Sequence, residues 1–156
     1  MKISAIEEYG LRCLLQLARQ SEVGTLMSAE EIAEHEGLSL AYVEKILSQL
    51  RKVGLIQSVR GMYGGYKLSR PPEEIRVGEF MRAVDGDFFA DMCQHFAGKE
   101  SACIHMGSCS VRPVWLMVAR HLYRILDHLS LADLLQEEGG LERSLFTEFP
   151  LPVQAQ

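Results

Sequence analysis

Apolar residues recur at helical spacing in the first part of the chain. A stripe over residues 3–20 predicts an amphipathic helix. Ser28 with Glu31 forms a capping box that opens a short helix ending near His35. Gly37 interrupts the pattern before a third helix, which runs from residue 39 to about residue 53. Three helices in this order, with a tight turn between the second and the third, predict a helix-turn-helix unit.

The pattern then changes to that of strands. LIQSVRG and GYKLSR are two short strand-like runs around MYGG, a glycine-containing turn, so a β-hairpin is expected. Pro71 and Pro72 close this unit. We therefore expect a mainly α-helical fold with a small β-hairpin wing, in which residues 1–72 form a winged helix-turn-helix domain.

One long helix dominates the pattern beyond residue 72. We expect a connecting helix at 73–84, a loop at 85–112 and helices at 113–138, where Pro113 suits a first helical turn. Apolar residues then recur at spacings of three and four, namely Trp115, Val118, Leu122, Ile125 and Leu129. Such a stripe fits either core packing or the seam between two copies of the helix. Residues 139–156, which contain two prolines, are expected to form a flexible tail.

Residue types in the helix-turn-helix segment indicate DNA binding. Ala33, Gly37 and Val43 supply the small residue, the turn glycine and the apolar plug that two crossing helices need. The third helix would direct its first residues at base edges in the major groove, while the wing would approach the backbone and minor groove. Tyr63 at the wing tip would wedge into a groove or lie on the surface. The candidate DNA contacts are Ser39, Ala41, Tyr42, Glu44, Lys45, Arg51, Arg60, Gly61, Tyr63, Gly64 and Gly65.

The net charge of −5 hides a basic segment. Residues 1–70 carry nine Lys or Arg against eight Asp or Glu, whereas residues 71–156 carry seven against thirteen. Between residues 45 and 70 there are six bases and no acid, as expected of a surface that binds duplex DNA. The sequence shows no signal peptide and no membrane span, so we expect a cytoplasmic protein whose thiols stay reduced.

Three of the four cysteines lie within CQHFAGKESACIHMGSC, residues 93–109. They would form a disulfide, fill space, bind zinc or hold an iron–sulfur cluster. A reducing compartment disfavours the disulfide, and the close cysteine pairs typical of structural zinc sites are missing. The gaps of nine and five residues favour a cluster on Cys93, Cys103 and Cys109. Cys13, within the first apolar stripe, is expected in the core.

The chain resembles a bacterial winged-helix family of iron–sulfur transcription regulators, of the IscR and NsrR type. The resemblance rests on the three cysteines, SLADLL, MKISAIEEYGLRCLLQLA and LSLAYVEKILSQLRKVGLIQSVRGMYGGYKLSRPPEEIRVGEFMRAVDG. It implies a homodimer whose long C-terminal helices cross. It also implies a [2Fe-2S] or [4Fe-4S] cluster on the three cysteines, and binding to a pseudo-palindromic double-stranded DNA operator that depends on cluster state.

Two departures from the family pattern leave the fourth cluster ligand open. The first cysteine gap is longer than usual, and Arg112 stands where the IscR type has a histidine ligand. The NsrR type uses an acidic residue from the first helix of the other subunit, and this position matches Glu8. His105 and His95 are the alternatives within the loop, and a water ligand or none is also open.

We therefore expect a transcriptional regulator, a repressor in the simplest case, that senses iron or cluster status, redox state or nitric oxide. No nucleophile–base pair, phosphate-binding loop or dinucleotide fingerprint is present, so an enzyme is not expected. The alternative is a zinc- or thiol-based redox sensor of the same fold without a cluster. A protein-interaction module that has lost DNA binding is a third class, which the acid-free basic segment disfavours.

Overall fold

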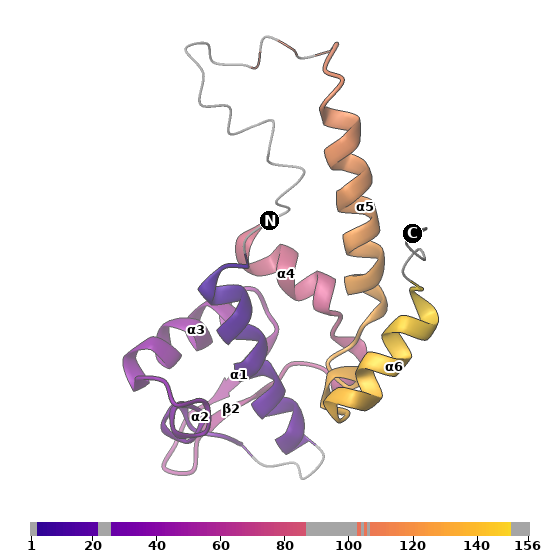
Figure 1. The fold of residues 1–156 in the computed structure, drawn as a ribbon. Coiled ribbons are helices and arrows are strands. Elements are labelled where there is room, and N and C mark those ends of the chain that lie inside the picture. The colour runs from indigo at the N-terminus through magenta and orange to yellow at the C-terminus, as the bar shows by residue number, and fades with distance from the viewer. Residues whose placement is uncertain (1–2, 22–25, 87–102, 104, 106, 151–156) are drawn as a thin grey trace.

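The structure, a computed structural model, describes residues 3–21, 26–86, 103, 105 and 107–150 (Figure 1). Its elements follow the predicted order of helices, hairpin and helices. They are α1 (Ala5–Ser21), α2 (Ala29–Glu36), α3 (Leu40–Lys52), β1 (Ile56–Val59), β2 (Gly65–Leu68), the 3-10 turn η1 (Pro72–Glu74), α4 (Val77–Asp85), α5 (Arg112–His128), the 3-10 turn η3 (Asp133–Leu135) and α6 (Glu138–Glu148). The mainly helical fold with a two-stranded wing is thus confirmed.

The predicted helix signals of the first unit are present as hydrogen bonds. The Glu31 amide donates to the Ser28 hydroxyl at 3.1 Å, and the Ser28 amide donates to the Glu31 carboxylate at 2.7 Å. These two bonds satisfy exposed donors at the start of α2. Gly37 ends α2 in the left-handed conformation, with φ of 65°, which a residue with a Cβ adopts at a cost. α2 and α3 are thereby joined by a tight turn.

The core lies where α1, α2 and α3 meet the base of the wing and α4. Phe80 of α4 is fully buried, and a Cβ at Gly10 of α1 would lie only 3.1 Å from its ring. Gly10 therefore lets α4 pack closely on α1. The other fully buried side chains of this core include Leu14, Leu17, Ile32, Val43, Ile46, Leu47, Leu50, Leu55, Ile56 and Ile75.

The wing is an antiparallel hairpin anchored to the helices. Ile56 pairs with Leu68 at its base, and Val59 pairs with Gly65 near its tip. The Tyr66 amide donates to the Met27 carbonyl at 2.8 Å, and the Met27 amide donates to the Tyr66 carbonyl at 3.1 Å. This bridge joins the wing to the segment before α2, so the hairpin does not stand alone.

α4 fixes the second half of α5 to the winged unit. Arg82 donates to the Asp127 carboxylate with both terminal nitrogens, and its guanidinium lies 4.7 Å from the centre of the Tyr123 ring. A Cβ at Gly78 would collide with the same carboxylate, so the glycine admits the close approach of α5. In Figure 1 the first half of α5 extends beyond the body of the molecule.

The apolar stripe of α5 divides into a packed half and an uncovered half. Leu122, Ile125 and Leu129 are half-buried, whereas Trp115 and Val118 are 44% and 40% exposed. The short helix α4 reaches only the second half of α5. Core packing within the described part of the chain therefore does not account for the first half of the stripe.

The end of the chain differs from the prediction in two places. Of the helices expected at 113–138, the part after α5 forms only the 3-10 turn η3, which ends where Gln136 takes an extended conformation. The amides of Leu131 and Ala132, just before this turn, donate to the carbonyls of Ile75 and Pro72. The segment expected as a flexible tail contains the helix α6.

The formation of α6 has a visible reason in the packing. Leu141, Leu145 and Phe149 recur every four residues and are all half-buried. His128 Nε2 of α5 lies 2.8 Å from a Glu148 carboxylate oxygen, and the His128 ring makes an edge contact with the Phe149 ring. Pro150 follows the last helical turn, so it does not interrupt α6.

Candidate nucleic-acid interface and thiol segment

The recognition helix α3 buries one face and exposes the other. Its buried residues, Val43, Ile46, Leu47 and Leu50, hold it against the core. Ser39 occupies the N-cap position without a side-chain capping bond, and Ala41, Glu44 and Lys45 are exposed on the first turns. Four of the predicted base-edge candidates therefore lie together at the exposed start of α3.

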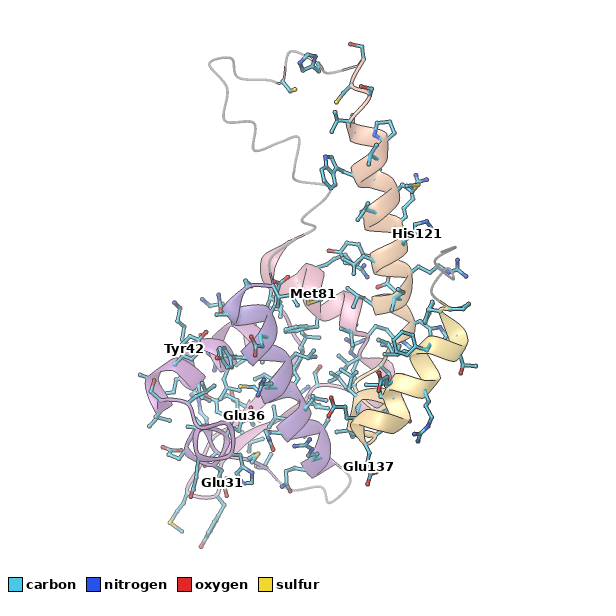
Figure 2. All side chains as sticks on the ribbon, in the orientation of Figure 1. Glu31, Glu36, Tyr42, Met81, His121 and Glu137 are labelled. Carbon is cyan, nitrogen blue, oxygen red and sulfur yellow. The ribbon has the colours of Figure 1, made fainter. Side chains whose placement is uncertain are left out.

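Tyr42 differs from this group. It is also a candidate DNA contact, but its side chain, labelled in Figure 2, is half-buried. It packs edge-on against Tyr9 of α1, with ring centres 5.9 Å apart. The Arg12 guanidinium lies 5.9 Å from the centre of the Tyr9 ring and pairs with Glu8 at 3.1 Å. A row of contacts therefore runs from Glu8 on α1 to Tyr42 on the recognition helix.

The wing tip presents Arg60, Met62 and Tyr63 to solvent, with Met62 86% and Tyr63 85% exposed. Gly61 has φ of 127° and accepts a hydrogen bond from the Gly64 amide at 2.9 Å. A Cβ at Gly64 would collide with the Val59 carbonyl. The hairpin itself therefore requires these glycines, whatever they contribute to DNA contact.

Gly65 is similarly constrained, since a Cβ there would lie 2.8 Å from the Met27 carbonyl oxygen. Met62 was not among the predicted contacts. Its only signal in the sequence is an apolar residue placed in a hairpin turn, where polar and glycine residues are usual.

The basic side chains between residues 45 and 70 are exposed on α3 and the wing. Arg51 of α3 donates to the Ser58 hydroxyl of β1 at 3.4 Å, which links the two elements. Arg70 pairs with Glu79 at 2.6 Å, so its charge is partly neutralised. The remaining exposed bases are Lys45, Lys52, Arg60 and Lys67.

The described cysteines fall into two classes. Cys13 is fully buried, and burial raises the pKa of its thiol to about 12, so it stays protonated at neutral pH as expected of a core residue. Cys103 and Cys109 are free thiols that are half-buried. Cys109 comes three residues before α5, after a turn closed by a hydrogen bond from the Ser108 amide to the His105 carbonyl.

The described residues do not complete a metal site by themselves. Among them, no three His, Cys, Asp or Glu side chains come together as ligands would. His105 is exposed, and Glu8 is held in its pair with Arg12. Cys93 and His95 lie outside the described residues. None of the described helices is long and apolar enough to cross a membrane.

A recognition helix behind a tight turn, an anchored wing and a basic segment without acids over residues 45–70 define a winged helix-turn-helix DNA-binding protein. The chain belongs to the Rrf2 family of iron-dependent transcriptional regulators, whose model matches residues 3–137. It is thus a DNA-binding transcriptional regulator and not an enzyme. The helix α6 begins at residue 138, directly after the matched segment.

Named relatives agree with this assignment. The chain is 36% identical over 135 residues to the HTH-type transcriptional regulator IscR of Aliivibrio salmonicida, covering 86% of this chain and 77% of the relative. It is 34% identical over 144 residues to IscR of Klebsiella pneumoniae, covering 92% and 85%.

Two solved structures share the fold over most of both chains. T. potens IscR has a TM-score of 0.67 and 30% identity, covering 97% of this chain and 94% of that one. CymR, described as the global cysteine regulator of B. subtilis, has a TM-score of 0.66 and 31% identity, covering 86% and 96%.

Proposed function

We propose that this regulator holds an iron–sulfur cluster and represses transcription from an operator whose affinity depends on cluster state. The observation that carries the proposal is the contrast among the thiols. Cys103 and Cys109 are free and half-buried, and Cys109 lies three residues before α5, whereas Cys13 is buried in the core. IscR-named relatives match over this same segment.

The donor set suits iron. Thiolates are the usual ligands of iron–sulfur clusters, and Cys103 and Cys109 are reachable without unfolding. Cys93 would be the third ligand. A bound cluster supplies a redox-active group that reacts with oxygen or nitric oxide and depends on iron supply.

The fourth ligand is proposed to be Glu8 of the partner subunit. Within the chain Glu8 pairs with Arg12, but both side chains are about half exposed, at 51% and 55%. Such exposed pairs stabilise weakly, typically by about 0.2–1 kcal/mol, so the carboxylate is available to another partner at little cost. His105, which is also exposed, and His95 are the competing donors.

A homodimer would bring the cysteines of one chain close to Glu8 of the partner subunit. The first half of α5 exposes a run of large apolar side chains that nothing in the described chain covers, which favours a second copy of the helix as their partner. These residues are Val114, Trp115, Leu116, Met117 and Val118, and Val111 lies exposed just before the helix. Two recognition helices related by a two-fold axis would read a pseudo-palindromic operator.

The described contacts suggest how Glu8 would influence DNA binding. Arg12 stacks over Tyr9, and Tyr9 supports Tyr42 at the start of the recognition helix. When Glu8 leaves Arg12 for another partner, the guanidinium loses its fixed position above Tyr9. The support of Tyr42 would then change, and with it the orientation of the residues facing the major groove.

The test is cluster retention in single-cysteine variants. After anaerobic reconstitution with iron and sulfide, Cys103→Ala and Cys109→Ala should lose most of the visible thiolate-to-iron absorption, as should Cys93→Ala. Cys13→Ala is the matched control and should keep it, because that thiol is buried and protonated. A full-intensity spectrum from Cys103→Ala would refute the ligand assignment.

The same preparation tests the fourth ligand. Glu8→Ala should keep its cluster, because a carboxylate is a weaker partner for iron than the thiolates that remain. The cluster should decay faster in air, because one of its ligands is missing. Normal cluster stability in Glu8→Ala with a loss in His105→Ala would move the ligand into the loop.

The CymR likeness supports one alternative, a thiol-based sensor without a cluster. The fold matches a CymR structure described as an oxidized form, from Staphylococcus aureus, with a TM-score of 0.66. In that case wild-type protein would stay colourless after reconstitution, and DNA binding would instead respond to reversible oxidation of Cys103 or Cys109.

A further inference from the structure

The wing tip carries two apolar side chains that nothing in the fold uses. Met62 and Tyr63 are the most exposed large apolar residues among those the structure describes, and the next, Ile3, is 61% exposed. Both side chains lie in a tight turn and make no contact with the core. Highly exposed apolar groups placed side by side point to a binding role.

The turn holds this pair on a firm support. The hydrogen bond from the Gly64 amide to the Gly61 carbonyl closes the turn, and the pair of Val59 with Gly65 lies directly beneath it. At the other end, Ile56 and Leu68 are buried in the core. A projection fixed in this way loses little conformational freedom when it enters a partner.

The surroundings of the pair identify the partner. Arg60 precedes the turn and Lys67 follows it, both exposed, and no acid occurs from residue 45 to residue 70. Apolar side chains flanked by basic side chains suit a partner that is negatively charged at its rim and apolar inside. The minor groove meets this description where a base step opens, because phosphates form its rims and an inserted apolar side chain contacts the apolar faces of the two bases.

We propose that Met62 and Tyr63 form a wedge that enters the minor groove of the operator and partly unstacks one base step. The proposal rests on the operator binding proposed above and adds a mode of sequence selection to it. Pyrimidine–purine steps unstack most readily. The wing would therefore prefer TA or CA steps in the operator flanks without any hydrogen bond to a base.

The probe is a set of end-labelled duplexes selected from a random-sequence library by the wild-type protein. Permanganate oxidises thymines that are unstacked, so it reports the wedge directly. Wild-type protein should give hyperreactive thymines at two flanking positions placed symmetrically about the operator centre. The selected sites should also be enriched in TA and CA at those positions.

The variant Met62→Ala/Tyr63→Ala should lose both the hyperreactivity and the enrichment, with affinity reduced about tenfold. Its salt dependence should stay unchanged, because no phosphate contact is removed. Arg60→Ala should show the opposite pattern. The slope of log affinity against log salt concentration should fall in magnitude by about one, and the hyperreactive thymines should be retained. Met62→Leu/Tyr63→Phe keeps the apolar bulk and should behave as wild type.

Phe146→Ala is the control, because it removes an exposed aromatic ring from α6, far from the wing in sequence. The wedge is refuted if wild-type protein binds its selected duplex with no hyperreactive thymine. It is also refuted if the double alanine variant keeps wild-type affinity and sequence preference, or if it changes only the salt slope. Failure of the wild-type protein to select any duplex would overturn the proposed operator binding as well, so the two failures are distinguishable.

Discussion

At the scale of single residues, burial predicts which cysteines react with reagents in solution. Cys13 lies in the core, where desolvation and the nearby Glu36 carboxylate raise the pKa of its thiol to about 12. Only a thiolate attacks an alkylating reagent or binds iron. Cys103 and Cys109 are half-buried, and both are free thiols.

We therefore expect iodoacetamide to modify Cys103 and Cys109 rapidly in the native apo-protein at neutral pH. Cys13 should react only after denaturation. Mass spectrometry of peptides from a time course measures the three rates separately, and modification of Cys13 in the folded protein at a comparable rate would contradict its place in the core.

At the scale of elements, a short motif fixes the end of α5 to the winged unit. The Ser130 hydroxyl and amide both donate to the Asp133 carboxylate, at 2.6 and 2.8 Å, and the Leu131 amide donates to the Ile75 carbonyl at 2.9 Å. The two bonds from Ser130 hold the pKa of Asp133 below its ordinary value. A carboxylate with a lowered pKa stabilises the folded state while it is ionised.

Replacing Asp133 by Asn should lower the free energy of unfolding at neutral pH by about 0.5–1.5 kcal/mol, a typical value for hydrogen bonds of this kind. The difference between wild type and variant should shrink as the pH falls below the ordinary aspartate pKa of about 3.9 and through the lower folded value, where the wild-type carboxyl becomes protonated.

Urea unfolding at a series of pH values gives this comparison, with Glu142→Gln, an exposed carboxylate of α6, as the control. If the free energies of unfolding of wild type and Asp133→Asn differ by the same amount at every pH down to the lowest tested, the charge of Asp133 does not contribute to stability.

The elements that the sequence predicts well are those whose signals are local. The capping box at Ser28 and the glycine at residue 37 fix α2 through neighbours within a few residues. The 3-10 turn η3 depends instead on bonds to Ile75 and Pro72, and α6 depends on His128. Tyr42 is half-buried because of Tyr9, thirty-three positions earlier, which no local pattern of α3 reveals.

The candidate site shows the same division. The pattern of α3 was enough to place Ser39, Ala41, Glu44 and Lys45 together on one exposed face. Met62 was missed because the spacing of a turn does not tell whether an apolar side chain is covered. The position of Cys13 in the core followed from the apolar stripe of α1 and is confirmed.

At the scale of the whole molecule, α5 has a packed half and an exposed half. Its second half is clamped to α4 through Arg82 and Asp127, while its first half exposes Trp115 and the residues around it beside Cys109. In the homodimer proposed above, with Glu8 of one copy as a ligand in the other, the thiol segment would lie next to the winged unit of its partner. Events at the thiols would then be coupled to the spacing of two recognition helices.

The most direct test of this coupling is the affinity of the apo- and cluster-loaded proteins for one operator duplex. The duplex is selected from a random library by both forms, and binding is followed anaerobically by fluorescence anisotropy. We expect the two forms to differ by about tenfold or more, within the usual range of coupling between sites. Cys103→Ala, treated in the same way, should show one affinity under both conditions. Equal affinities of the two wild-type forms would contradict regulation of DNA binding by the cluster.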